Sequence, residues 1–195
     1  AAIAPAASPA HDRPDALEPT LEAQVTHAPP NSRGPYGTHI SVVSVDPEPG
    51  EVDVLQYVAV DDCGNKLNPL IVDGQVHGGV VQGLAQALYE EAAYDDDGNL
   101  QSSSLAEYLV PAASDVPSIT LGESITPSPT NPLGVKGVGE AGTIGAAPCV
   151  MNAVVDALSG LGVHDIQMPA SPVKVWTAIQ EARNNTTTST MENQQ

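Results

Sequence analysis

The chain has 195 residues, enough for one domain with extended ends, and 41% of them are apolar, which is sufficient for a core. It contains no Phe and one Trp, so the core must consist of Val, Leu, Ile and Ala, while 18 Pro and 17 Gly argue against a helical bundle. The formal charge of −18 repels phosphate backbones and argues against nucleic-acid binding.

The charge pattern also bears on the environment of the protein. Twenty-four acidic residues are dispersed along the chain and face only six Lys and Arg. This pattern predicts a solvated acidic coat and is typical of a halophile-like cytoplasm, where salt screens the repulsion. The apolar stretches are too short to span a membrane, and the N-terminus lacks the features of a signal peptide. We therefore expect a cytoplasmic protein, and a start without Met is consistent with a fragment of a longer chain.

The sequence predicts no metal site of its own. Cys63 and Cys149 lie far apart and belong to no CxxC pair, so neither a disulfide framework nor a structural zinc site is expected. His77 has no second histidine at ligand spacing. The motifs HExxH, GxSxG and Walker A do not occur in the sequence.

The N-terminal segment and the first strands differ sharply in composition. Residues 1–35 are rich in Pro, Ala and polar groups, which predicts an extended or disordered lead-in. The domain is expected to occupy 36–183. It begins with two β-rich stretches, 38–46 and 52–60, and the turn 47–50 between them predicts a hairpin.

A helix is predicted over 74–91, where apolar residues recur at helical spacing, with Asp73 as its N-cap. An acidic turn follows over 95–99. A calcium loop is the alternative, but Gly98 stands at the wrong position for one, and Ala106 replaces the bidentate Glu that the loop requires.

The next stretch is expected to be extended. Short strands are predicted over 105–110 and 118–121 from their β-forming residues. Residues 126–132 carry three prolines and are expected to form a loop.

The last elements are helical. A helix is predicted over 147–161, with Pro148 in its first turn, and another over 172–183. The polar tail 184–195 is expected to be disordered. This order of elements predicts an α+β (mixed α/β) domain.

The segment 134–145, GVKGVGEAGTIG, is the most informative for function. Its five glycines permit close approach of another group, and the loop delivers free N–H groups to the start of a helix, where an anion is stabilised. Its one carboxylate belongs to Glu140, and a carboxylate on a tight, partly dry loop can serve as a general base. Taken alone, the residues favour a structural loop with a solvent-facing Glu140.

Residues 137–142 also match GxGxxG, the dinucleotide fingerprint. That motif requires a preceding strand and an acidic residue about 20 positions further on. Here a Pro-rich loop precedes the match, position 160 is Gly, and Asp156 lies within the predicted helix. A nucleotide-binding module is a distant alternative.

The first helix carries a polar face formed by Gln75, Gly79, Gln82 and Gln86, which are spaced i, i+4, i+7 and i+11. Three amides beside a glycine gap can hydrogen-bond a polar heterocycle. A solvent-exposed face explains the spacing equally well.

Residues 68–88, NPLIVDGQVHGGVVQGLAQAL, and 137–148, GVGEAGTIGAAP, carry a resemblance to a known family. In their order and spacing they resemble the molybdopterin-binding large subunit of the xanthine dehydrogenase, aldehyde oxidase and aerobic carbon monoxide dehydrogenase family. The TPSP run at 126–129 is similar to that of the carbon monoxide dehydrogenase branch. The resemblance covers residues 17–183 and implies the C-terminal portion of the molybdopterin-binding domain.

The resemblance assigns roles to individual residues. Glu140 matches the glutamate that acts as general base beside molybdenum, and Gln75 matches a glutamine that contacts the cofactor. Four further residues match positions that line the pterin and the metal: Lys136, Gly137, Val138 and Gly139.

The resemblance also implies the cofactors and partners. The cofactor would be molybdenum-molybdopterin, as the cytosine dinucleotide, and the substrate would be carbon monoxide, an aldehyde or an N-heterocycle, oxidised with water as oxygen source. FAD would lie on a medium partner subunit and a [2Fe-2S] cluster on a small iron-sulfur subunit, and such partners can hold the complex at the inner face of the membrane.

The sequence also departs from the family pattern. The family's large subunit is much longer, and its substrate loop and Gly-Gly-Phe-Gly motif have no counterpart here. The remainder of the large subunit must therefore supply most of the pocket, and the isolated chain is expected to be inactive. The alternative is a catalytically inactive remnant or partner-binding fragment.

Overall fold

The computed structural model describes residues 24–26, 28 and 34–192, with side chains through 185. The chain divides into two compact units, Ala1–Ser32 and Arg33–Gln195. In the first unit, the described residues form no helix or strand, and most of the predicted lead-in lies outside the described residues. All elements below belong to the second unit.

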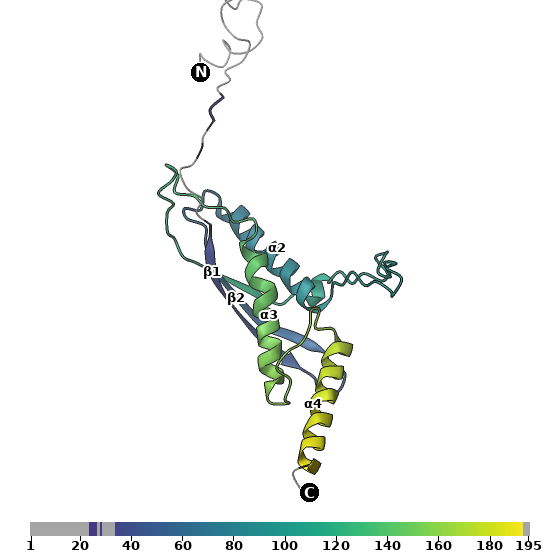
Figure 1. Cartoon of the computed structure of the whole chain (residues 1–195). Coiled ribbons are helices and arrows are strands. Elements are labelled where there is room, and N and C mark those ends of the chain that lie inside the picture. The colour runs from purple at the N-terminus through teal and green to yellow at the C-terminus, as the bar shows by residue number, and fades with distance from the viewer. Residues whose placement is uncertain (1–23, 27, 29–33, 193–195) are drawn as a thin grey trace, which may run out of the picture. The chain divides into compact units, whose positions relative to one another are not determined.

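A three-stranded sheet in the order β1-β2-β3 forms the base of the second unit (Figure 1). Strand β1, Tyr36–Val45, pairs antiparallel with β2, Val52–Asp62, which confirms the predicted hairpin. Strand β3, Ile119–Glu123, pairs parallel with β2 and confirms the short strand expected near 118–121. Helices and a small mixed sheet together make the predicted α+β fold.

The sheet presents one face to the core because side chains alternate along each strand. On β1 and β2 the inward positions include His39, Val43, Tyr57 and Ala59, which are buried or half-buried. The opposite face exposes aliphatic side chains such as Ile40, which is 59% exposed. The inward face is therefore the one that receives the helices.

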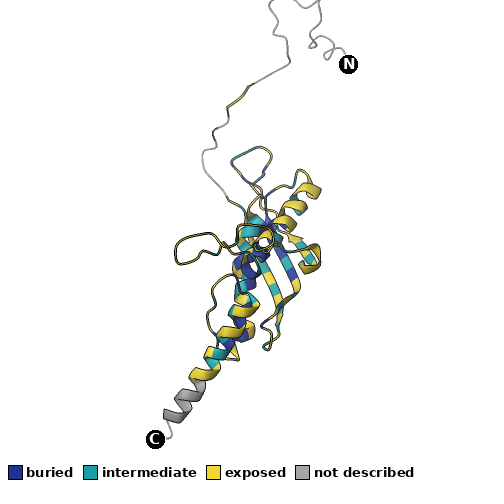
Figure 2. Cartoon of the chain, turned by 90° about the vertical axis from the view of Figure 1, so that its right-hand side faces the viewer, coloured by how far each residue is buried: buried dark blue, intermediate teal, exposed yellow. Residues whose placement is uncertain are grey.

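Helices α2, Pro69–Leu88, and α3, Ala141–Ser159, lie side by side, and α3 packs against β1 and β2 (Figure 1). Among the helices in the described ranges, α3 alone is long and apolar enough to cross a membrane by length and composition, which corrects the expectation that every apolar stretch is too short. Its buried residues pack against α2 and the sheet, so a core position accounts for its composition (Figure 2).

Helix α2 begins earlier than predicted. Its N-cap is Asn68, whose Oδ1 accepts a hydrogen bond from the Ile71 amide at 3.3 Å, and Pro69 occupies the first turn. The predicted N-cap Asp73 is wrong, because its carboxylate binds the Lys66 ammonium at 3.0 Å. Apolar periodicity misplaced the start, since the apolar side chains of the first turn face outward rather than toward the core.

Helix α3 also begins earlier than predicted, directly after Glu140. Pro148 therefore lies inside the helix and not in its first turn, which corrects the prediction. A proline there removes the hydrogen bond to the carbonyl of Ile144. Both residues are exposed, so water can satisfy that carbonyl.

The strand predicted over 105–110 is wrong. The amide of Tyr108 donates to the Ser104 carbonyl at 2.8 Å, and the Ser104 hydroxyl donates to Glu107 at 2.8 Å, which closes a turn. The aliphatic side chains that favoured a strand are exposed, with Leu105 at 85%, so they add no buried contact that would hold a strand.

The acidic turn at 95–99 is confirmed as a turn. Gly98 adopts φ +81°, and the Asp95 carboxylate accepts hydrogen bonds from the amides of Asn99 and Asp97 at 2.8 and 3.1 Å. These bonds lower the pKa of Asp95.

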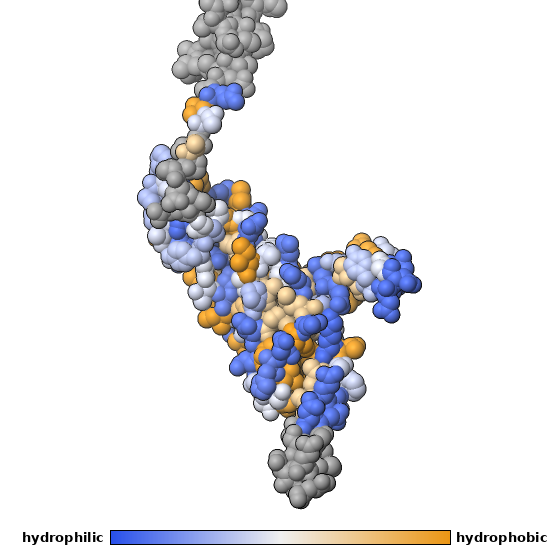
Figure 3. Space-filling view, in the orientation of Figure 1, coloured by the Kyte–Doolittle hydropathy of each residue, from blue (hydrophilic) through white to orange (hydrophobic). Residues whose placement is uncertain are grey.

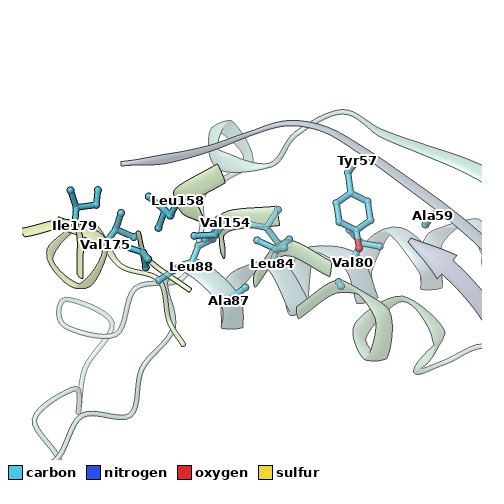
Figure 4. Close-up of a cluster of buried hydrophobic side chains, with 14 of the residues drawn as sticks. Tyr57, Ala59, Val80, Leu84, Ala87, Leu88, Val154, Leu158, Val175 and Ile179 are labelled. Atoms are coloured by element: carbon cyan, nitrogen blue, oxygen red, sulfur yellow. The ribbon is translucent and has the colours of Figure 1, made fainter. Parts of the chain in front are cut away.

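Helix α4, Pro172–Glu192, extends beyond the predicted end at Arg183. The backbone of 184–192, expected to be disordered, is therefore helical. The core connects α4 to the sheet in a continuous row of side chains (Figure 4). That row runs from Ile179 and Val175 on α4, through Leu158 and Leu84, to Tyr57 on β2.

Candidate functional site

Two segments far apart in sequence meet at the start of α3. A Cβ added to Gly139 would lie 4.0 Å from the Oε1 atom of Gln75, the amide on the second turn of α2. Glu140, the next residue along the chain, is the N-cap of α3. The structure therefore brings the predicted cofactor-contacting glutamine and the predicted base loop together.

Close contact between the two helices fixes this meeting point. A Cβ on Gly79 would lie 3.0 Å from the Cα of Gly142, and a Cβ on Gly142 would lie 2.6 Å from the Val76 carbonyl oxygen. The Thr143 hydroxyl donates to the Gly79 carbonyl at 3.0 Å. Only glycines permit this backbone approach.

The predicted polar face of α2 is therefore divided. Gln75, Gln82 and Gln86 are exposed, as both interpretations of the sequence require. Gly79, by contrast, is buried against α3 and serves helix packing, so it is no gap for a ligand.

Backbone pairing holds the loop that leads to Glu140. The amide of Lys136 donates to the Cys63 carbonyl at 2.8 Å, and that of Asn65 donates to the Gly134 carbonyl at 3.0 Å. Gly134 has φ +66°, a conformation that favours glycine. A rigid turn after β2 thus positions the loop. No strand leads directly into α3, contrary to the dinucleotide fingerprint.

The Lys136 side chain is buried and forms an ion pair with Asp62. Its ammonium lies 3.1 Å from Oδ1 of Asp62 and 5.0 Å from the centre of the Tyr36 ring, and the Lys136 and Asp62 side chains are 6% and 0% exposed. Burial alone would raise the pKa of Asp62. The neighbouring polar groups of Thr126, the Gly64 amide, Lys136 and Tyr36 instead lower the pKa well below its usual range. Of these, the Gly64 amide and the Lys136 ammonium donate to Oδ1 of Asp62, at 2.8 and 3.1 Å. The family resemblance places Lys136 among the residues that line the cofactor, and that role stays a prediction; in the structure its ammonium pairs with Asp62.

Glu140 projects from the first turn of α3. Its carbonyl accepts a hydrogen bond from the Ile144 amide at 3.0 Å, whereas its side chain makes no capping bond and is exposed. The described residues therefore present the carboxylate but do not enclose it. The dry surroundings that a general base requires must come from outside them.

The remaining predicted residues lie beside this carboxylate. Gly137 has no atom within 4 Å of an added Cβ, so a flat group can approach its backbone. Val138 lines an open pocket of about 240 Å³ together with Cys63 and Ile71. No group of three metal-ligating side chains occurs in the described parts of the chain.

These features fit a pterin-type group. An exposed amide at Gln75 and an unobstructed backbone at Gly137 suit a polar, planar ring.

The sequence pattern did not predict a polar cluster between β1 and β2. His39 on β1 contacts Tyr57 and Asp61 on β2, and all three side chains face inward. The alternation of β1 could have indicated it, because His39 stands at an inward position among Val residues.

The chain is similar to known proteins in sequence. Residues 4–117 match the family described as "Molybdopterin cofactor-binding domain". The chain is 40% identical over 171 residues to the carbon monoxide dehydrogenase large chain of Hydrogenophaga pseudoflava, covering 88% of this chain and 21% of that one. It is 43% identical to the nicotine 6-hydroxylase large subunit of Paenarthrobacter nicotinovorans, covering 83% and 20%.

Solved structures show the same likeness. Carbon monoxide dehydrogenase from Oligotropha carboxidovorans superposes with a TM-score of 0.81 at 37% identity, covering 89% of this chain and 22% of that one. Quinoline 2-oxidoreductase from Pseudomonas putida 86 gives 0.78 at 40% identity, covering 87% and 22%. The chain thus spans about a fifth of the length of the relatives that it matches. It belongs to the molybdopterin cofactor-binding domain family.

Proposed function

We propose that this chain supplies the general base Glu140 and part of the molybdopterin cradle of a molybdenum hydroxylase. The substrate would be carbon monoxide, an aldehyde or an N-heterocycle, with water as oxygen source. The observation that carries the proposal is the approach of the Gln75 amide to Gly139, directly beside the exposed carboxylate of Glu140. These are the positions that the family resemblance assigns to cofactor contact and proton transfer.

Each residue of the site would have a separate role. The bound molybdenum-molybdopterin group, as the cytosine dinucleotide, would supply the oxidation chemistry. The Gln75 amide would hydrogen-bond the pterin, while the backbone of Gly137 to Gly139 lets the ring approach. Glu140 would accept a proton from the attacking water-derived oxygen. Lys136, paired with Asp62, would hold the loop in place for this transfer.

The site needs further protein, because Glu140 is open to solvent. The start of α2 exposes an aliphatic group beside the open pocket: Leu67, just before the N-cap, and Leu70 and Ile71 in the first turn are 66%, 83% and 60% exposed. Apolar patches interrupt the hydrophilic surface in Figure 3. Such surfaces mark protein contacts. We propose that the remainder of the large subunit covers this aliphatic group and encloses the carboxylate.

The other partners would complete electron transfer. A medium FAD subunit and a small iron-sulfur subunit with a [2Fe-2S] cluster would accept electrons from the molybdenum centre. We place the complex in a cytoplasm of high salt, which suits the acidic coat, either free or at the inner face of the membrane through its partners. The isolated chain would be inactive.

Metal and pterin content test the proposal. The chain is expressed in its native host with and without the remainder of the large subunit, and molybdenum is measured by elemental analysis and pterin by fluorescence after oxidation. Cofactor that appears only in the complex supports the proposal. Absence of cofactor under both conditions identifies the chain as an inactive remnant.

A further inference from the structure

A buried polar cluster lies between the sheet and the first turns of α3. The two ring nitrogens of His39 have different partners: Nδ1 lies 2.8 Å from the Tyr57 hydroxyl, and Nε2 lies 3.3 Å from both carboxyl oxygens of Asp61. The His39 side chain is 3% exposed, and Tyr57 is fully buried. The two rings meet edge to face at 5.7 Å and 80°.

The hydrogen bonds fix the orientation of the ring. A carboxylate only accepts, so Nε2 carries a proton and donates to Asp61. Burial raises the pKa of Tyr57 well above its usual range, and the nearby Cys149 and Asp61 raise it further. The Tyr57 hydroxyl therefore keeps its proton and can donate it to Nδ1 of His39. The imidazole is therefore held at both nitrogens and cannot rotate without breaking a buried hydrogen bond.

Two glycines accommodate this fixed ring. A Cβ on Gly145, in the second turn of α3, would lie 2.6 Å from Nδ1 and 2.7 Å from Cε1 of His39. A Cβ on Gly37 would overlap Oδ1 of Asp61. The imidazole is thus in direct contact with the backbone of α3, one turn after Glu140.

We propose that His39 is a positioning residue: its ring, oriented by Asp61 and Tyr57, sets the distance of the first turns of α3 from β1. The link from these turns to catalysis rests on the proposed function, because Glu140 is the N-cap of the same helix. The α2 contact fixes α3 from one side through Gly79 and Gly142, and His39 fixes it from the sheet.

The cluster can be reached from outside. A pocket of about 110 Å³ is lined by His39, Asp61, Tyr36, Ala141 and Ile144, among others. Removal of the imidazole enlarges this pocket, so free imidazole can re-enter the space.

The first test is a double-mutant cycle on the 195-residue chain, measured by amide hydrogen exchange of residues 144–147. Gly145→Ala should reduce protection there about tenfold, the change that a lost packing interaction of ordinary size produces. Gly160→Ala, at a position with no neighbour within 4 Å, is the matched control and should leave protection unchanged. In a His39→Ala background, Gly145→Ala should no longer reduce protection, since the new methyl group finds room.

Additive effects in this cycle would overturn the proposal. So would a uniform change that includes 150–158, where α3 packs in the core. If His39→Ala does not fold, ring resonances of His39 replace it as the readout. They should shift in Gly145→Ala and not in Gly160→Ala, and equal shifts would overturn the proposal.

Chemical rescue provides the second test. Imidazole added to folded His39→Ala should restore protection at 144–147, which general destabilisation would not allow, and failure of rescue would contradict the positioning role. In the assembled enzyme, Gly145→Ala should lower kcat with KM unchanged. If the assembled wild-type enzyme holds no cofactor, the proposed function fails, whereas the exchange results still decide the role of His39.

Discussion

The Cα of Gly142 on α3 lies 3.0 Å from the place where a Cβ on Gly79 of α2 would stand. The two helices therefore touch backbone to backbone at the level of Gln75 and Glu140. This contact joins the two sequence segments that resemble the cofactor-binding parts of the family.

Replacement of Gly79 by Ala should separate the helices. The new methyl group overlaps the backbone of Gly142 and Thr143, so we expect a loss of about 1–3 kcal/mol in the free energy of unfolding. Gly78→Ala is the matched control: it lies one position earlier, with no neighbour within 4 Å, and should stabilise the helix by up to about 1 kcal/mol. Urea unfolding followed by circular dichroism measures both, and equal effects would refute backbone contact at Gly79.

The buried Asp62–Lys136 ion pair should affect stability when one partner is removed. Asp62→Asn leaves the buried Lys136 ammonium unpaired and should cost about 3 kcal/mol at pH 7. A double variant with Lys136→Met should recover part of that loss, because no charge then remains buried. Urea unfolding of the three variants measures this, and a double variant less stable than Asp62→Asn would contradict it.

The pH dependence of the same pair has a definite sign. The pKa of Asp62 is lowered in the folded state, so its stabilisation is fully present above the unfolded pKa of about 3.9 and is lost as the pH falls toward the folded pKa. The difference in unfolding free energy between wild type and Asp62→Asn should therefore be constant from pH 7 to about pH 5 and shrink below about pH 4. A difference that grows on acidification would exclude this carboxylate as the source.

The structure and the sequence pattern assign different N-caps to α2, Asn68 and Asp73 respectively. Asn68→Ala removes the bond to the Ile71 amide and should cost about 1 kcal/mol, whereas Asp73→Ala removes only a partly exposed ion pair and should cost less. Thermal unfolding of both variants checks this, and the reverse order would restore Asp73 as the cap.

Local pattern predicted the hairpin, β3, and the existence of all three helices, because alternation and helical spacing reflect burial. It placed the starts of α2 and α3 too late, since their first turns carry Leu70 and Ile144 on the outside and so lack the buried pattern. It predicted a strand over 105–110, although the aliphatic side chains of this stretch are exposed.

The site could be predicted only in part. The family resemblance identified Gln75 and the Gly139–Glu140 loop as separate cofactor-facing segments, and the structure shows them adjacent. The contact between Gly79 and Gly142, the committed ammonium of Lys136 and the His39 cluster depend on residues far apart in sequence. No local periodicity records such contacts.

Turnover of the assembled enzyme carrying Glu140→Gln tests the central claim most directly. Molybdenum and pterin should remain bound, while kcat falls on the order of 100- to 10,000-fold, because the amide cannot accept the proton. Glu48→Gln, in an exposed turn, is the matched control and should turn over as wild type does. Full turnover by the Glu140→Gln enzyme with its cofactor in place would contradict the assignment of Glu140 as the base.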